Sequence, residues 1–416
     1  MSTGSPTRPQ VYRRRRIAAL GGLAVVAALV TGGVYVPTAA TADLPDAVPV
    51  VAAPAVPAPA AAVPAFPSFG SGAIGAVGFD GVLAAAGDPG PVPIASITKV
   101  VTALVVLEAR PLAAGEEGPE IAFTSEDVAL YNEVLGRNGS VQPVRAGLVL
   151  SQREALETML VPSAGNYAES LVRWAYGSEE AFVTAARSWL DAHGLVDTMI
   201  VEPTGISPEN RSTLADLVEL AKLALQNAAV AEIVALPTAE VDGVGALANT
   251  NKLLGTLGVD GIKTGTTEEA GACLLFAADF AVGSRTVTLV GVVLGGATHP
   301  LLNAGIAALI ESVRPGFSEV TLTTAGEVYG SYTTEWGESA EAVATATETA
   351  LVWSDTPVTA TVQLDPLEEA PAGTDVGAVT ATAGTTTVVV PLELDADLDA
   401  PDFWWRMSNP PWARAG

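Results

Sequence analysis

Ile94-Ala95-Ser96-Ile97-Thr98-Lys99-Val100-Val101 is the stretch around which the 416-residue chain can be interpreted. It opens an apolar helical pattern and carries one of only four lysines in the sequence. A spacing of three puts the Ser96 hydroxyl and the Lys99 amine on one helical face, about one turn apart. An amine whose pKa is lowered by burial or by a second cation can take the hydroxyl proton. The stretch therefore predicts an activated serine, although most such spacings are helix caps followed by a solvated lysine.

A second lysine lies in Gly261-Ile262-Lys263-Thr264-Gly265-Thr266-Thr267, just before an apolar strand pattern. On an edge strand, a lysine followed by small residues offers a cation, hydroxyls and open backbone N–H groups to an extended substrate with a terminal carboxylate. The glycine would let a ligand approach the backbone. A simple turn that leads into a strand would explain this segment about equally well. A third segment, Pro162-Ser163-Ala164-Gly165-Asn166-Tyr167, reads as a polar loop between two helices.

Together these three segments resemble the Ser-x-x-Lys, Ser-x-Asn and Lys-Thr-Gly motifs of the serine-active penicillin-recognising enzymes. The chain is most similar to secreted serine-type D-alanyl-D-alanine carboxypeptidases of the actinobacterial type, over residues 93–294. The resemblance implies an α/β (α+β) fold: a transpeptidase-like domain of antiparallel sheet and helices, followed by a small all-β domain.

Carried over residue by residue, the resemblance implies that Ser96 is the acylated nucleophile and Lys99 its base. Ser163 would relay protons between the lysine and the leaving group. Backbone N–H groups of Ser96 and Thr266 would form the oxyanion hole. Lys263 and the hydroxyls of Thr264 and Thr266 would hold the substrate's terminal carboxylate, and Gly265 and Asn166 would also belong to the substrate-binding residues.

One position departs from the family pattern. The second motif should carry asparagine two residues after Ser163, but Gly165 occupies that position and Asn166 follows. Two outcomes stay open. Either the amide contact to the substrate is lost and turnover is slow, or Asn166 swings in and restores the contact, since glycine makes the backbone permissive.

The leading functional hypothesis is a serine-type carboxypeptidase that removes the terminal D-alanine from peptidoglycan stem peptides ending in D-Ala-D-Ala, with β-lactams as covalent inhibitors. Transpeptidation, endopeptidation or β-lactam hydrolysis cannot be separated from it by motif. The alternative is a wall-binding scaffold protein that kept the fold and lost turnover, which Gly165 favours. Neither hypothesis needs a metal or an organic cofactor.

Composition and the few cysteine and histidine residues exclude further kinds of partner and site. The net charge of −26 would repel phosphate backbones, so we expect no nucleic-acid partner. The single cysteine, Cys273, lies in an apolar run and is expected to be a buried, inert thiol. The two histidines, His193 and His299, have no second histidine at ligand spacing, which argues against a His-based metal site or a Ser-His-Asp triad.

The N-terminal 42 residues predict export. Arg13-Arg14-Arg15-Arg16 precedes the charge-free run 17–36, which is long enough to cross a bilayer as one helix with its basic end in the cytoplasm. Ala40-Thr41-Ala42 matches a signal-peptidase site. Membrane anchoring and secretion after cleavage near Ala42 both stay open, but residues from 43 onward are expected outside the cytoplasm.

The rest of the chain divides into an Ala/Pro/Val-rich linker (43–68), a catalytic domain (69–316) and a β-rich domain with a tail (317–416). Prolines in the linker favour an extended spacer and exclude a helix or a paired strand. The C-terminal aromatics around 403–405 are expected to pack internally, because no basic amphipathic helix accompanies them. Helices are predicted at 96–109, 152–160, 179–193 (with Ser178 as cap and Gly194 as stop) and 213–227, a hairpin at 273–280 and 286–294, and further strands at 319–323, 358–364, 376–382 and 386–392.

Overall fold

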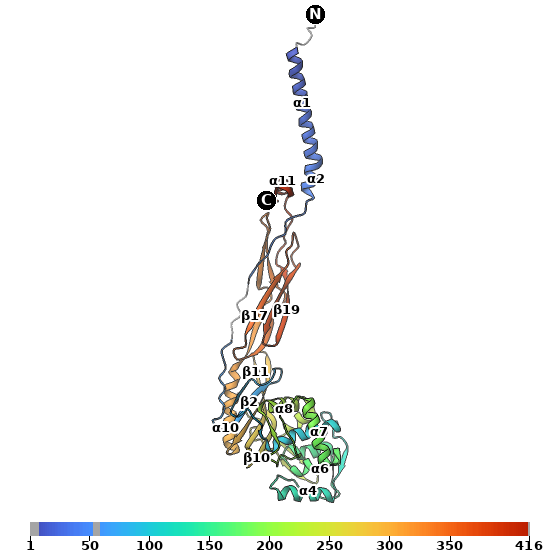
Figure 1. Cartoon of the computed structure of the whole chain (residues 1–416), viewed down its shortest axis with the longest axis vertical. Coiled ribbons are helices and arrows are strands. Elements are labelled where there is room, and N and C mark those ends of the chain that lie inside the picture. Colours follow the sequence, from blue (N-terminus) through green and yellow to red (C-terminus); the bar gives the residue numbers. More distant parts are fainter. Residues whose placement is uncertain (1–7, 53–58, 415–416) are drawn as a thin grey trace. The chain divides into compact units, whose positions relative to one another are not determined.

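The computed structural model describes residues 8–52 and 59–414 (Figure 1). The chain forms two compact units. We call the unit made of 59–319 and 351–355 the mixed unit. The other, with described residues 8–52, 320–350 and 356–414, is the β unit.

The described part of the mixed unit is built on a five-stranded antiparallel sheet in the order β10-β11-β12-β2-β3. The predicted hairpin is confirmed by β11 and β12, whose turn is shorter than the expected 281–285 because Val282 already pairs with Arg285. Strand β10 lies at the sheet edge, as the Lys263 motif predicted. The strands are β2 (Ser71–Ala76), β3 (Ala84–Ala86), β10 (Val259–Thr267), β11 (Gly271–Val282) and β12 (Arg285–Gly296).

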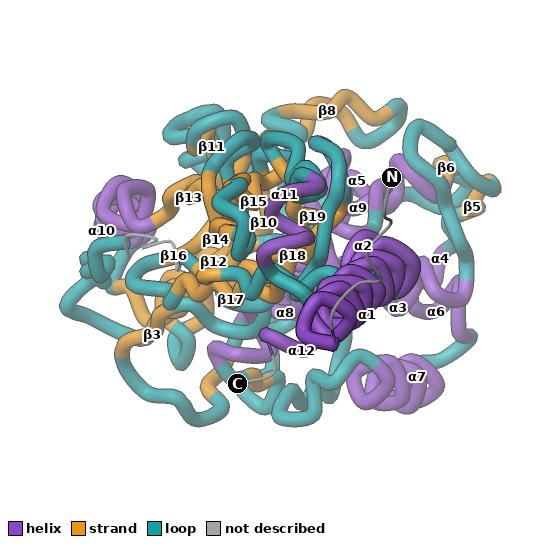
Figure 2. The backbone as a smooth tube through the Cα atoms, turned by 90° about the horizontal axis from the view of Figure 1, so that it is seen from above, coloured by secondary structure: helices purple, strands orange, loops and turns teal. Residues whose placement is uncertain are grey.

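Both faces of this sheet are buried, which explains the near-continuous apolar runs of its central strands. Leu274 and Phe276 pack in one cluster with α10, whereas Cys273 and Leu275 pack in another with the remaining helices. Figure 2 shows α10 and the group α3 to α7 on opposite sides of the strands. The helices are η2 (Ala95–Ile97), α3 (Thr98–Ala109), α4 (Ser125–Gly136), α5 (Gln152–Leu160), α6 (Gly165–Tyr176), α7 (Glu179–Ala192), α8 (Leu214–Gln226), α9 (Ala228–Val234), α10 (His299–Val313) and η3 (Arg314–Gly316).

The four predicted helices are confirmed, and their ends follow local chemistry. The Ser178 hydroxyl accepts a hydrogen bond from Ala181 N at 3.2 Å and caps α7, and Gly194 takes the left-handed conformation just after it. Short strand pairs connect the helices: β4 (Val92–Pro93) with β7 (Arg211–Ser212), β5 (Glu120–Ala122) with β6 (Val149–Ser151), and β8 (Thr238–Val241) with β9 (Gly245–Ala248).

The described part of the β unit contains a six-stranded antiparallel sheet in the order β1-β14-β15-β19-β18-β17. Its Thr- and Val-rich strands were predicted; β14, which carries a bulge between Val328 and Gly330, and β15, whose buried positions are alanines, were not. The strands are β1 (Val50–Val51), β14 (Val328–Thr333), β15 (Ser339–Ala344), β17 (Val358–Leu364), β18 (Asp375–Ala383) and β19 (Thr386–Leu394). A separate pair is formed by β13 (Phe317–Thr323) and β16 (Glu348–Trp353).

One expectation for the linker is wrong. Val50 and Val51 pair with Ser331 and Gly330 of β14, so the stretch 43–68 does contain a paired strand. Proline blocks pairing only where its missing N–H is needed, and Val50 and Val51 keep theirs on a sheet edge. The middle of the predicted linker, 53–58, lies outside the described residues.

Helix is continuous from Arg8 to Ala40, as α1 (Arg8–Val30), the wider turn η1 (Thr31–Tyr35) and α2 (Val36–Ala40). Its stretch Val11–Ala40 is long and apolar enough to cross a membrane. The chain ends in α11 (Phe403–Ser408) and α12 (Pro411–Arg414). The expectation of internal packing fails for part of this tail, because Phe403 and Trp404 are 50% and 74% exposed.

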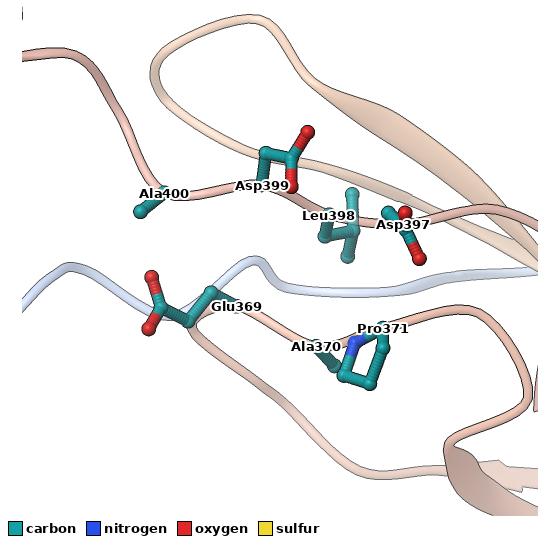
Figure 3. Close-up of a pocket in the computed structure, with 7 residues that line it drawn as sticks. All are labelled: Glu369, Ala370, Pro371, Asp397, Leu398, Asp399 and Ala400. Carbon is teal, nitrogen blue, oxygen red and sulfur yellow. The ribbon is translucent and has the colours of Figure 1, made fainter.

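The β unit also carries a shallow hollow lined by acidic and small residues (Figure 3). Asp397 accepts a hydrogen bond from Ala372 N at 2.7 Å, so this carboxylate already serves the turn beside it. Within the described residues no group of His, Cys, Asp and Glu side chains could hold a metal ion, here or elsewhere. The residues with chemistry gather in the mixed unit instead.

Candidate active site

Ser96 and Lys99 meet as their spacing predicts. Ser96 lies in η2 and Lys99 in the first turn of α3, and Lys99 Nζ lies 2.9 Å from Ser96 Oγ. The ammonium group is not solvated: Lys99 is 2% exposed, whereas Ser96 is half-buried at the cleft. An amine within hydrogen-bond reach of a serine hydroxyl is the arrangement required for general-base activation.

Two glycines hold the backbone of this serine from both sides. A Cβ on Gly205 would lie 2.0 Å from Ala95 O, and one on Gly265 would lie 3.1 Å from Ser96 N. Ala95 itself has a φ of 47°, the left-handed region that non-glycine residues rarely adopt. Gly265 was expected to admit a ligand to its backbone; what approaches it here is the nucleophile's own segment. The peptide that presents Ser96 is therefore strained and tightly clamped.

Lys99 has a second partner and two carboxylates near it. Its Nζ donates to Thr204 O at 2.6 Å. Burial lowers the pKa of Lys99 to about 8, while the negative charges of Glu202 and Glu169 act in the opposite direction. Sequence reasoning attributed part of this lowering to Lys263, but burial is the main cause. A pKa near 8 leaves a usable fraction of free amine at neutral pH.

Glu202 organises the loop that faces Lys99. Its carboxylate is buried and accepts hydrogen bonds from Thr204 N and Oγ1 at 2.8 and 2.6 Å and from Gly205 N at 2.7 Å. Asn210 Nδ2 adds another at 2.8 Å. Sequence reasoning missed Glu202, since no local pattern connects it with a lysine a hundred residues earlier.

The Lys263 motif lines the opposite wall on edge strand β10. Lys263 is 1% exposed and its Nζ donates to Thr264 O at 3.1 Å. Burial, followed by repulsion from Lys99, lowers the pKa of Lys263 well below its usual value. The Thr264 hydroxyl hydrogen-bonds with that of Thr250. The structure thus brings Thr264, Gly265 and Thr266 to the cleft that holds Ser96, whereas Lys263 lies buried behind it and is not among the described residues that line it.

His299 is a further cleft residue that sequence reasoning did not assign. It begins α10, after the strand β12, and its Nε2 lies 2.7 Å from Thr266 Oγ1. Burial and the positive charge of Lys263 both lower the pKa of His299. The imidazole is therefore neutral at neutral pH and hydrogen-bonds with a hydroxyl predicted to bind substrate. The only sequence feature that could have indicated this role is that the histidine follows a predicted strand by a few residues.

The expected loop 162–167 extends in fact only to Ala164, because Gly165 and Asn166 already belong to the first turn of α6, and its three residues of interest are placed differently. Ser163 is buried, has a φ of 67° and lines the cleft with Ser96. Gly165 also lines the cleft, on the side of Lys99. Asn166 is not among the described residues lining it: its amide donates to Gln142 O and accepts from Gln142 N, both at 3.0 Å. Asn166 thus holds the neighbouring loop instead of reaching into the cleft.

The cleft consists of two adjoining cavities that share Ser96, Ser140 and Thr266. One, of about 370 Å³, extends past Lys99 and Gly165 toward Arg137. The other, of about 380 Å³, extends past Ser163 and Thr264 toward Lys252 and His299. Ser96 therefore lies between two spaces, which suits a peptide that passes over the serine on both sides of the bond to be cut.

Cys273, as expected, is fully buried, and burial raises the pKa of its thiol to about 11.

Comparisons with known proteins identify the family to which the chain belongs. The family model described as D-alanyl-D-alanine carboxypeptidase matches residues 80–298, a little over half of the chain. A D-alanyl-D-alanine endopeptidase of Pseudomonas aeruginosa is 35% identical over 192 residues, which are 44% of this chain and 58% of that protein. The carboxypeptidase DacF of Bacillus subtilis is 27% identical over 52% of this chain and 54% of its own. The chain thus matches little more than half the length of these relatives.

Solved structures with the same fold include longer matches. A peptidoglycan synthesis regulatory factor from Streptococcus pneumoniae matches with a TM-score of 0.58 and 20% identity, over 81% of this chain and all of that one. Penicillin-binding protein 5 of Haemophilus influenzae matches with a TM-score of 0.57 and 19% identity, over 84% of this chain and 99% of that one. The mixed fold and the strand-rich region after it, both expected from the sequence, are therefore confirmed.

Proposed function

The chain belongs to the D-alanyl-D-alanine carboxypeptidase family of serine peptidases, and on that basis we propose that it removes the terminal D-alanine from peptidoglycan stem peptides. The observation that carries the proposal is the buried Lys99 amine 2.9 Å from the Ser96 hydroxyl. We further propose that Ser96, Lys99 and Ser163 are catalytic, and that Lys263, Thr264 and Thr266 bind the substrate's terminal carboxylate.

In the proposed acylation step, Lys99 takes the Ser96 proton as Oγ attacks the carbonyl carbon of the penultimate D-alanine. Backbone N–H groups would stabilise the oxyanion that forms, and we predict that those of Ser96 and Thr266 do so. When the C–N bond breaks, the proton passes through Ser163 to the leaving amine, and D-alanine departs. Water then attacks the acyl-serine ester, again with Lys99 as base, and frees the shortened peptide. The proposal uses no metal or organic cofactor.

The second candidate is cleavage of cross-linked peptides, which the name of the Pseudomonas aeruginosa relative favours. The same serine chemistry would apply, with the amine of a neighbouring stem peptide as leaving group. Release of D-alanine from a peptide ending in D-Ala-D-Ala, set against opening of a cross-linked dimer, separates the two. A chain that catalyses neither reaction would fit the scaffold alternative.

Covalent labelling tests the nucleophile directly. After exposure to a penicillin, the intact mass of the protein should rise by one β-lactam, and Ser96→Ala should abolish the increment. Ser188→Ala, which removes an exposed serine on α7, is the matched control and should keep it. An increment that persists in Ser96→Ala would overturn the assignment.

A further inference from the structure

The C-terminal helix α11 packs against the end of the long N-terminal helix, where η1 and α2 lie (Figure 1). Tyr35 Oη donates to Met407 O at 2.7 Å. Arg406 Nη1 donates to Ala40 O at 3.3 Å and to Ala42 O at 3.0 Å. A cationic side chain on the last carbonyls of a helix is electrostatically favourable. The residues around the predicted cleavage site are thus bound by the other end of the chain.

The same short helix is also held to the loops of the β unit. The rings of Trp405 and Trp336 meet edge to face with centroids 5.5 Å apart. Trp336 Nε1 in turn donates to Asp399 O at 2.7 Å. Helix α11 is therefore wedged between the N-terminal helix and the strand region of its own unit, and its orientation is fixed by contacts on two sides.

The remaining aromatic side chains of this tail face outward. Phe403, Trp404 and Trp412 are 50%, 74% and 54% exposed, and Trp412 also meets the Tyr35 ring edge-on with centroids 5.3 Å apart. Several large exposed aromatics in one short segment are unusual on a surface that faces only water. Trp and Tyr concentrate where a membrane meets water, because one part of the ring is apolar and the other polar.

The position of these aromatics along the spanning helix identifies what covers them. The charge-free run 17–36 rises about 30 Å at 1.5 Å per residue, the thickness of the hydrocarbon core. In a helix that crosses a bilayer over this run, Tyr35 at its far end would lie at the membrane–water boundary, and α11 lies beside it. This run also exceeds the 7–15 apolar residues usual in a cleaved leader. Cutting after Ala42 would remove Tyr35 and the acceptor groups of Arg406.

We propose that the segment 35–42 and the tail 403–412 form one interfacial anchor in the uncleaved protein, with Phe403, Trp404 and Trp412 inserted at the headgroup level of the outer leaflet. The partner is the lipid bilayer itself. Attraction to anionic lipid is not the driving force, because Asp399 and Asp402 flank the aromatics. Binding rests on aromatic burial. The proposal concerns attachment, and it stands or falls independently of the peptidase activity.

Tryptophan quenching in vesicles tests the anchor. The full chain is reconstituted in phosphatidylcholine vesicles whose acyl chains are brominated near the headgroup, and the quenched fraction of emission is measured. The double variant Trp404→Phe with Trp412→Phe should lose most of the quenching, whereas Trp174→Phe in the mixed unit should keep it. Equal quenching in the double variant and the wild type would overturn the proposal. So would absence of quenching accompanied by self-association, which would assign the aromatics to a second copy.

Retention of the helix has its own measurement. The intact mass of the chain extracted from membranes should include residues before Arg8, and little protein should be found in the medium. Anionic lipid added to the vesicles should leave the tryptophan quenching unchanged. A mature protein that begins at Asp43 and is released from cells would contradict the proposal.

Discussion

The two walls of the cleft hold a buried lysine in opposite ways. On the helical wall, Lys99 bonds to the Ser96 hydroxyl and to Thr204 O, and two carboxylates lie near it. On the strand wall, Lys263 bonds to Thr264 O among hydroxyl groups, and the nearest charge that shifts its pKa is that of Lys99. Burial lowers the pKa of both amines, but only Lys99 has negative charges that moderate the effect.

This difference suits two roles. Lys99 has a pKa near 8, so protonated and free forms coexist at neutral pH, as a group that repeatedly accepts and releases a proton requires. Lys263 lacks that moderation until an anion arrives. A carboxylate brought by the substrate would supply the negative charge and favour the protonated amine.

The largest effect is expected from Lys99→Arg. Arginine keeps a positive charge but cannot act as a base at neutral pH, and loss of a general base typically costs about 10²- to 10⁴-fold in rate. Stopped-flow acylation by a chromogenic β-lactam measures it. Lys222→Arg is the matched control, a buried lysine outside the cleft that bonds to Phe79 O. In the wild type, acylation should rise with pH around 8 as Lys99 loses its proton. A Lys99→Arg rate close to wild type would remove the contrast between the walls.

The next effect concerns the gap in the helical wall at Gly165. An asparagine amide there would restore a hydrogen bond worth about 1 to 3 kcal/mol, or roughly ten- to a hundredfold in acylation rate if it forms only in the transition state. A Cβ at 165 would lie 3.0 Å from Val134 Cγ1, a side chain that can shift. We expect Gly165→Asn to raise the rate.

Asn166→Ala is the companion variant. Because the Asn166 amide is bonded to Gln142, its loss should lower stability, seen as a lower melting temperature, more than it lowers the acylation rate of folded protein. The reverse pattern, with Gly165→Asn neutral or harmful and Asn166→Ala strongly damaging to acylation, would mean that Asn166 swings into the cleft. If neither variant changes acylation, Ser163 must be reconsidered as the residue of this motif.

The residues of the cleft differ in how well the sequence alone predicts their place. The Ser96–Lys99 pair and the Lys263 strand were predictable, because each rests on neighbours in the chain and on a helical or strand period. Glu202 and Gly205 act on Ser96 and Lys99 from about a hundred residues away, and only the folded chain brings them together. The place of Asn166 could not be decided from the sequence for the same reason, since its partner Gln142 is 24 residues away.

A smaller effect is expected when the moderating charge is removed. Glu202→Gln takes a negative charge away from Lys99, so the pKa of Lys99 should fall and the acid limb of the acylation profile should move to lower pH. The amide replaces an acceptor beside Thr204 N and Gly205 N, so the variant should also lose about 1 to 3 kcal/mol of unfolding free energy. Glu209→Gln, an exposed change nearby, is the control. A limb that moves to higher pH would reverse the assigned sign.

The smallest effect is expected from His299 on the strand wall. If its neutral imidazole orients the Thr266 hydroxyl for the substrate carboxylate, His299→Ala should raise KM by about 2- to 10-fold, the value of one hydrogen bond, with little change in kcat. His299→Asn, which can still hydrogen-bond, should recover most of the loss at neutral pH. With a peptide whose terminal carboxylate is replaced by an amide, neither variant should change KM. The pKa of His299 is lowered, so a cationic role would emerge only on the acid side. If His299→Asn is as damaging as His299→Ala and the loss grows toward acid pH, the imidazolium acts as a third cation beside Lys263, and the strand wall recognises the carboxylate by charge more than by its hydroxyls.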